Sequence, residues 1–108
     1  MTLQFDNNIM IKHIVMLRLK DYPSEEKQRH LEKLKSMIEG LMGKVPELKF
    51  MEVGLNINKK PSAYDLVLTS HFDSEEALDA YRVHPEHKKV LDFLFKVTKE
   101  TAVVDYGY

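Results

Sequence analysis

The sequence predicts an α+β fold of the ferredoxin-like type, with elements in the order β-α-β-β-α-β. Segments whose apolar residues fall at every second position, as in strands, alternate with segments whose apolar residues recur every third or fourth position, as in helices. With 108 residues, of which 44% are hydrophobic, the chain suits one domain around a single core. We therefore expect a four-stranded antiparallel sheet with helices on one face.

The first half of this fold is expected between residues 10 and 57. Alternation over residues 10–20 predicts the first strand, and residues 48–57 form the second. Between them, Ser24 is a favourable N-cap for a helix, with acids in the first turn, where the helix dipole favours them. The apolar residues of this helix recur three and four positions apart, and two glycines end it (Leu31, Leu34, Ile38 and Leu41, then Gly40 and Gly43).

The second half repeats the pattern after a turn-rich connection. The alternation over residues 64–72 predicts the third strand, and Ser74 is expected to cap a short helix. Pro85 suits the first position of a second helix, expected over residues 85–99, because its missing N–H has no partner to lose there. A final strand is expected over residues 101–106.

One face of the predicted sheet has no helices to cover it. An exposed apolar face of this size is unusual on a soluble monomer. We therefore predict a homodimer, formed through this open sheet face, which makes a dimeric α+β barrel. The residues expected on the open face are mostly apolar (Ile14, Met16, Met51 or Val53, Val67, and Val103 or Val104).

Composition excludes several classes of protein. The net charge is -1 and the lysines and arginines are interleaved with acids, so no nucleic-acid partner is expected. The chain has no cysteine, which excludes disulfides and thiolate metal sites. No apolar run approaches the ~20 residues that span a bilayer. Residues 1–9 lack the features of a secretory signal and are predicted to be a flexible extension of the domain 10–108, so a cytoplasmic location is expected.

The segment from Tyr81 to His87, Tyr-Arg-Val-His-Pro-Glu-His, is the strongest candidate for a site. An imidazole gives and takes protons near neutrality because its ordinary pKa is about 6.5. His87 is therefore a candidate general base, with Tyr81 stabilising an enolate oxygen. His84 is expected to be structural, because an N-cap before Pro85 can accept a hydrogen bond from the amide of His87.

Other interpretations of these residues stay open. His87 and Tyr81 could simply pack beneath the helix start, and His13 lies on an apolar strand face, where an imidazole is usually a core residue. A three-histidine zinc site of His13, His84 and His87 is a further alternative. Helical zinc pairs are more often four residues apart than three, so we predict no metal and no cofactor. The remaining histidines are expected to be peripheral (His30 and His71).

Five segments, in the same order along the chain, resemble the stress-responsive dimeric α/β-barrel (Dabb) domain family. They are residues 11–17 (IKHIVML), 64–68 (YDLVL), 76–81 (EALDAY), 84–87 (HPEH) and 103–106 (VVDY). The resemblance covers roughly residues 10–106 and implies a ferredoxin-like protomer assembled as a dimeric barrel. It also implies relatives among plant polyketide cyclases, such as olivetolic acid cyclase, which close a linear poly-β-keto chain by aldol condensation.

By motif, the resemblance assigns catalytic roles to three residues. His13 resembles the first-strand histidine of the cyclases, Tyr81 their helix tyrosine, and His87 their catalytic histidine. A further histidine of the cyclases falls on Leu66, which removes one polar group from the implied pocket. This departure argues against identical polyketide chemistry.

Three functional hypotheses follow. In the first, the chain is a cyclase or lyase-like enzyme for a small, apolar keto- or hydroxy-bearing compound, with His87 as base, Tyr81 as oxyanion partner and His13 as the orienting residue. In the second, the same cavity binds a small apolar ligand without catalysis, as in a stress-related binding protein. In the third, the domain is a structural dimerisation module.

Overall fold

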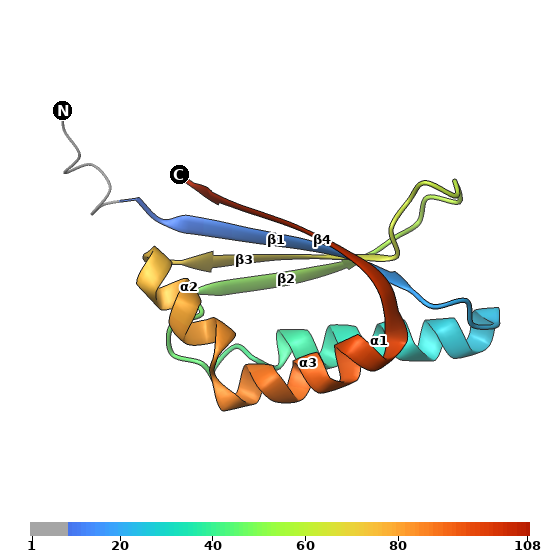
Figure 1. Ribbon diagram of the computed structural model, residues 1–108, viewed down its shortest axis with the longest axis horizontal. Helices are drawn as coiled ribbons and strands as arrows, with labels where there is room; N and C mark the ends of the chain where they lie inside the picture. The colour runs from blue at the N-terminus through green and yellow to red at the C-terminus, as the bar shows by residue number, and fades with distance from the viewer. Residues whose placement is uncertain (1–8) are drawn as a thin grey trace.

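The structure is a computed structural model that describes residues 9–108. A single sheet is covered on one face by three helices, as Figure 1 shows, which confirms the ferredoxin-like prediction. The elements are β1 (Ile11–Leu19), α1 (Ser24–Glu39), β2 (Phe50–Leu55), β3 (Leu66–Phe72), α2 (Glu75–Arg82), α3 (Pro85–Val97) and β4 (Thr98–Gly107). The segment between β3 and β4 forms two helices, as predicted from Ser74 and Pro85.

β1 is the strand on which the candidate site depends. The strand order is β2-β3-β1-β4, and each neighbouring pair is antiparallel. In this register His13 lies opposite Ser70 on β3 and opposite Asp105 on β4. Residues directly opposite one another in an antiparallel pair share a face, so Asp105 lies beside His13 on the helix side of the sheet.

The core fills the space between this sheet face and the helices. Leu17 and Leu19 on β1 and Leu34 on α1 are all at most 1% exposed. Burying a side chain of this size stabilises the fold by about 1.5–3 kcal/mol relative to an exposed position. The alternation of β1 and the three-and-four spacing of α1 therefore have the same cause, since both direct their apolar residues into one layer.

The two predicted serine caps have different outcomes. Ser74 is the N-cap of α2, and its Oγ accepts a hydrogen bond from the Ala77 N–H at 3.1 Å. For α1 the prediction is wrong, because the N-cap is Pro23 and no side chain caps the helix. Pro23 is held in an extended conformation, with φ −56° and ψ 152°, so Ser24 is already the first helical residue.

The boundary between the last helix and the last strand also differs from the prediction. α3 ends at Val97, and β4 begins at Thr98 rather than at residue 101. Thr98 is extended, and its hydroxyl donates to the Leu94 carbonyl at 2.9 Å, which satisfies a carbonyl at the helix end. β2 and β3 are shorter than predicted, since residues 48–49, 56–57 and 64–65 lie outside them.

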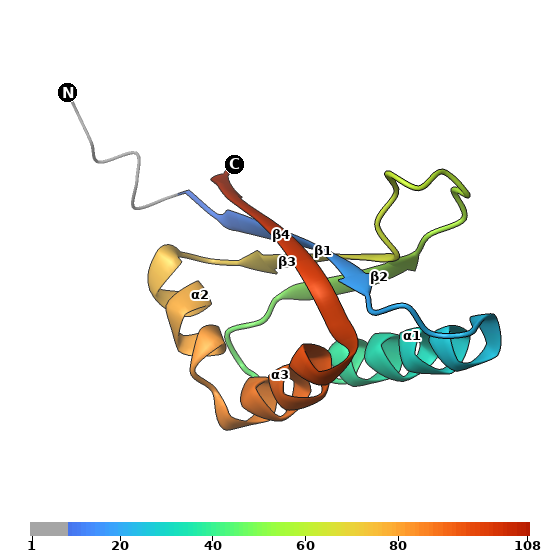
Figure 2. The same cartoon turned by 45° about the vertical axis from the view of Figure 1, so that its right-hand side comes forward.

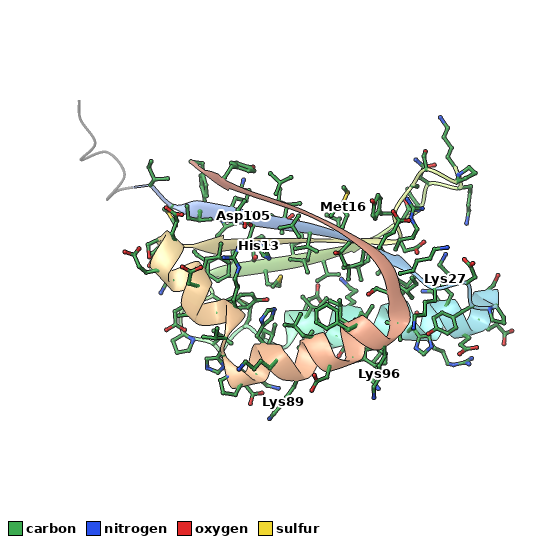
Figure 3. The ribbon with its side chains drawn as sticks, viewed as in Figure 1. His13, Met16, Lys27, Lys89, Lys96 and Asp105 are labelled. Atoms are coloured by element: carbon green, nitrogen blue, oxygen red, sulfur yellow. The ribbon has the colours of Figure 1, made fainter. Side chains whose placement is uncertain are left out.

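The sheet face opposite the helices, called the open face below, carries exposed apolar side chains as predicted, beside polar ones such as Lys12, Glu52 and His71, but β2 contributes different residues to it. Val53 pairs with Leu68 on the helix side and is only 4% exposed, so its placement on the open face is wrong. Met51 lies on the helix side too, opposite Ser70. The large exposed side chains of the open face are Met16 (Figure 3), Phe50, Val67, Val104, Tyr106 and Tyr108.

The predicted extension, residues 1–9, lies outside the described residues except for Ile9. This residue packs against the core. A Cβ at position 107 would clash with the Ile9 side chain, so a larger residue there requires Ile9 to move. In the described part of the chain, no helix has both the length and the apolar character needed to cross a membrane.

Candidate functional site

The three residues predicted to form a site, His13, Tyr81 and His87, come together between β1, the end of α2 and the start of α3. The ring of Tyr81 lies 4.2 Å from that of His87 and 6.5 Å from that of His13, centroid to centroid. Phe72 of β3 packs on the same tyrosine at 5.0 Å. The fold therefore unites residues that are as many as 74 positions apart in the sequence.

The turn between α2 and α3 directs His87 toward Tyr81. His84 is the N-cap of α3, as predicted, and Pro85 occupies the first turn. The ring of His84 accepts from the N–H of Glu86 at 3.1 Å, not from that of His87 as expected. Its Nδ1 is therefore used in the cap, which supports the structural role predicted for it.

The hydrogen bonding of His87 decides which of its nitrogens can act as a base. Nδ1 lies 3.1 Å from the carbonyl oxygen of Arg82. A carbonyl only accepts, so Nδ1 carries the hydrogen and the lone pair of the neutral ring is on Nε2. Burial lowers the pKa of His87 below its usual value, despite the opposing effect of the Arg82 carbonyl. The ring is therefore neutral at pH 7 and competent to accept a proton.

Tyr81 complements this base as a hydrogen-bond donor. It is 2% exposed, and its burial raises the pKa of the phenol well above the ordinary value. The phenol thus keeps its proton at neutral pH and can donate to a developing negative charge. No hydrogen bond to its hydroxyl is formed within residues 9–108.

Asp105 contacts the candidate site and was not identified by the sequence analysis. Its carboxylate accepts from Nδ1 of His13 and lies 2.8 Å from a guanidinium nitrogen of Arg82. Figure 3 shows His13 and Asp105 on the neighbouring strands β1 and β4. A carboxylate bonded to Nδ1 orients the imidazole and leaves Nε2 directed elsewhere. Only the strand register could have revealed this pair, since nothing in the local sequence links the two residues.

A cavity of about 290 Å³ lies against this carboxylate. Asp105 and Arg82 line it, whereas His13, Tyr81 and His87 do not. Its other walls come from the start of β1, from α2 and from the end of β4 (Ile9, Ile11, Glu75, Leu78, Asp79, Tyr106 and Gly107). The ring cluster is thus packed in this structure, and Asp105 connects it to the adjoining cavity.

The three-histidine metal hypothesis is not supported by the geometry. Across residues 9–108, no group of three or more histidines, acids or cysteines is arranged to hold a metal ion. A zinc site needs at least three such ligands within ~2.3 Å of one point.

The two remaining histidines lie away from the cluster. His30 packs between Tyr22 and Phe93, with ring centroids 4.6 and 5.8 Å away. His71 is on the open face, where its Nδ1 lies 2.9 Å from the hydroxyl of Tyr108. Neither ring contacts the cluster of His13, Tyr81 and His87, called the acid-base cluster below for the roles predicted for it, in agreement with the prediction that they are peripheral.

Comparison with protein families gives the family that the sequence resembles. The model of the stress responsive A/B barrel domain, Dabb, matches residues 11–107. The chain belongs to the Dabb family. Within this Dabb domain, the match extends from the first residue of β1 to the last residue of β4 and so includes every site residue named above.

Relatives of the Dabb chain are found among sequences and solved structures. An uncharacterized Streptomyces coelicolor protein is 34% identical over 79 residues, which cover 73% of this chain and 80% of that protein. A Bacteroides fragilis crystal structure, described as a dimeric protein with a ferredoxin-like fold, is 36% identical; the match covers 92% of this chain and 96% of that one with a TM-score of 0.85. The hydroxynitrile lyase of Passiflora edulis shares the fold at 18% identity, with a TM-score of 0.80 over 94% of each chain.

Proposed function

We propose that this Dabb protein is an enzyme of lyase or cyclase type that acts on a small, largely apolar compound bearing a keto or hydroxy group. The observation that carries the proposal is the pairing of a neutral imidazole with a protonated phenol, 4.2 Å apart between ring centroids. The two groups have opposite roles, since His87 accepts a proton and Tyr81 donates a hydrogen bond. General acid-base pairs of this kind accelerate reactions by typically 10²–10⁴-fold.

The proton transfers follow from these roles. Nε2 of His87 takes a proton from the substrate, either from a hydroxyl or from a carbon next to a carbonyl. In a hydroxynitrile, the O–H electrons form the carbonyl, the bond to the nitrile carbon breaks, and its electron pair leaves as cyanide. In a keto compound, the electrons left on carbon delocalise onto oxygen as an enolate. Tyr81 stabilises the oxygen that becomes negative, and His13, oriented by Asp105, positions the substrate.

A hydroxynitrile is a suitable test substrate, because one protein of this fold is named as a hydroxynitrile lyase. We would incubate the protein with racemic mandelonitrile and follow released benzaldehyde by its absorbance. His87→Ala should lower the rate about 100-fold or more while leaving the circular dichroism spectrum unchanged. His30→Ala is the matched control, as it removes an imidazole outside the cluster, and it should keep the wild-type rate.

A second variant tests the positioning residue. Asp105→Asn keeps the shape of the side chain but removes the charge that His13 contacts. We expect about a tenfold lower rate, together with changed ¹⁵N shifts of the His13 ring. Asp79→Asn is its control, because Asp79 also pairs with Arg82, at 2.9 Å, but forms no hydrogen bond to His13. Equal rates for Asp105→Asn and wild type would contradict the role given to His13.

The alternative is a non-catalytic protein that binds a ligand or only dimerises. Two observations favour it. The Tyr81 and His87 rings pack on one another, and the Nδ1 atoms of His84 and His87 form hydrogen bonds to the backbone. A wild-type protein that turns over neither mandelonitrile nor a 1,3-diketone, yet shows saturable binding of an apolar fluorophore, would establish the binding protein. Absence of both activities would leave the dimerisation module.

We also propose that the chain is a homodimer, joined through the open face. Six large apolar or aromatic side chains of this face are between 37% and 59% exposed in the single chain. Covering them stabilises a dimer by about 25 cal/mol per Å² of apolar surface removed from water. The Bacteroides fragilis relative, 36% identical, is described as dimeric, which supports the same assembly here.

A further inference from the structure

A second cavity lies at the opposite end of β1 from the acid-base cluster. Its volume is about 510 Å³, and it is formed by the end of β1, the first turns of α1 and the connection between β2 and β3, residues 56–65. Figure 2 shows this connection extending past the end of the sheet, above the start of α1. Arg18 at this end is five residues from His13, roughly 16 Å along the strand. The cavity is therefore separate from the candidate acid-base site.

The wall of this cavity has a pronounced excess of positive charge. It contains five cationic and two acidic side chains, and Glu100 pairs with Arg18 at 2.8 Å, so the formal excess is two positive charges on a chain whose net charge is -1. The acids of the first turn of α1, Glu25 and Glu26, do not line it. The charged lining residues are Arg18, Lys27, Lys59, Lys60 and Lys99, with Asp21 and Asp65.

The base of the cavity is held in place by hydrogen bonds. The guanidinium of Arg18 donates to the carbonyls of Pro61 and Ala63 at 3.1 and 3.0 Å, and so ties the connection to β1. The Asp65 carboxylate accepts from the N–H of Leu19 at 2.8 Å and pairs with Lys27 at 2.9 Å. Asp65 is thus committed to structural contacts, and it neutralises Lys27 rather than the other cations.

Three of the lysines remain available to a ligand. Within residues 9–108, neither Lys59 nor Lys60 forms an ion pair. Lys99 pairs with Asp21 at 2.8 Å, but the Asp21 side chain is 92% exposed. An ion pair with so exposed a partner is weak because water screens it, so an anion inside the cavity can replace it. The same wall carries neutral hydrogen-bonding groups from Ser24, Gln28 and Asn58, whereas both ends of the Asn56 amide are bonded to the backbone of Asn58.

We propose that this cavity binds a small organic phosphate, with the phosphate against Lys59, Lys60 and Lys99 and a polar body against the amide side chains. A phosphate monoester carries about −1.5 to −2 charges at pH 7, which matches the excess of positive charge. The volume lies within the ~300–1,000 Å³ of small-molecule sites and exceeds what inorganic phosphate alone would fill. The neutral donors and acceptors suit a hydroxylated body, such as a sugar, rather than an apolar one.

The test is a titration of the full-length protein, followed by ¹H–¹⁵N NMR, with ribose 5-phosphate as the probe. Ribose tests the neutral body alone, and inorganic phosphate tests the anion alone. We expect saturable shifts for the amides of residues 24–28 and 56–65 with ribose 5-phosphate, weaker binding of inorganic phosphate and none of ribose. Shifts confined to residues around His87 or spread evenly over the surface would overturn the proposal.

A pair of double variants separates the cavity from the overall charge. Lys59→Ser with Lys60→Ser removes two cations from the wall and should weaken binding at least about tenfold. Lys89→Ser with Lys96→Ser removes the same charge from the side of α3 that points away from the sheet (Figure 3), outside the cavity, and should leave binding unchanged. Equal weakening by both pairs would show a nonspecific charge effect and refute the site. Since the readout is binding, the result is independent of any lyase or cyclase activity.

Discussion

The chemistry of His87 is set by its surroundings at the scale of a single residue. Its Nδ1 is held by the Arg82 carbonyl, and burial disfavours the charged ring. The Tyr81 ring lies 4.2 Å from the His87 ring, centroid to centroid. Burial raises the pKa of Tyr81, because the charged form of a phenol is the deprotonated one. Burial therefore leaves both partners neutral, which is the state needed for a base and a hydrogen-bond donor.

The lowered pKa of His87 predicts how stability depends on pH. An unfolded chain has an imidazole pKa of about 6.5, above that of the folded state. Near and below this pH the unfolded state binds more protons, so the free energy of unfolding decreases as the pH falls. Urea unfolding between about pH 5 and pH 8 should show this slope in the wild type and a smaller one in His87→Gln. Identical slopes in the two proteins would exclude His87 as the source.

At the scale of secondary-structure elements, the sequence patterns predict where helices form better than where they begin. Serine followed by two glutamates occurs at residues 24–26 and at 74–76, and both segments start a helix. Only Ser74 has the extended backbone of an N-cap, because Pro23 takes that position before α1. The same local sequence thus gives a capped and an uncapped helix.

This difference predicts unequal effects of two matched substitutions. Ser74→Ala removes the acceptor for the Ala77 N–H and should destabilise the protein by about 1 kcal/mol. Ser24→Ala removes no cap and should change the stability by less than about 0.5 kcal/mol. Chemical denaturation of both variants beside the wild type measures the difference. A loss for Ser24→Ala as large as that for Ser74→Ala would contradict the assignment of Pro23 as the cap.

At the scale of the whole molecule, the sheet has one face in the core and one that the helices leave uncovered. Alternation along β4 places Val103 on the helix side and Val104 on the open face, opposite Val15 and Ile14 of β1 respectively. Both valines are more than half exposed in the single chain, so exposure alone does not distinguish them. Their faces do, because Val104 shares the open face with Met16 and Val67, whereas Val103 shares the other face with Val15.

The proposed dimer therefore predicts opposite outcomes for two adjacent residues. Val104→Glu introduces an unpaired charge into the interface and should convert the dimer into a folded monomer. Val103→Glu adds the same charge on the other side of the strand and should leave the dimer intact. Sedimentation velocity at micromolar concentration distinguishes the two species. A dimeric Val104→Glu variant would exclude the open face as the interface.

The sequence by itself determined the order of the elements, most residues of the core and the candidate residues His13, Tyr81 and His87. These depend on periodicity and on short motifs, which local sequence expresses directly. Strand register decided the rest: it placed Asp105 beside His13, moved Val53 into the core and set Phe50 on the open face. The 510 Å³ basic cavity also arises only in three dimensions, where residues 18–28 meet residues 56–65 and Lys99. Contacts between distant segments form through pairing and packing, which no local pattern encodes.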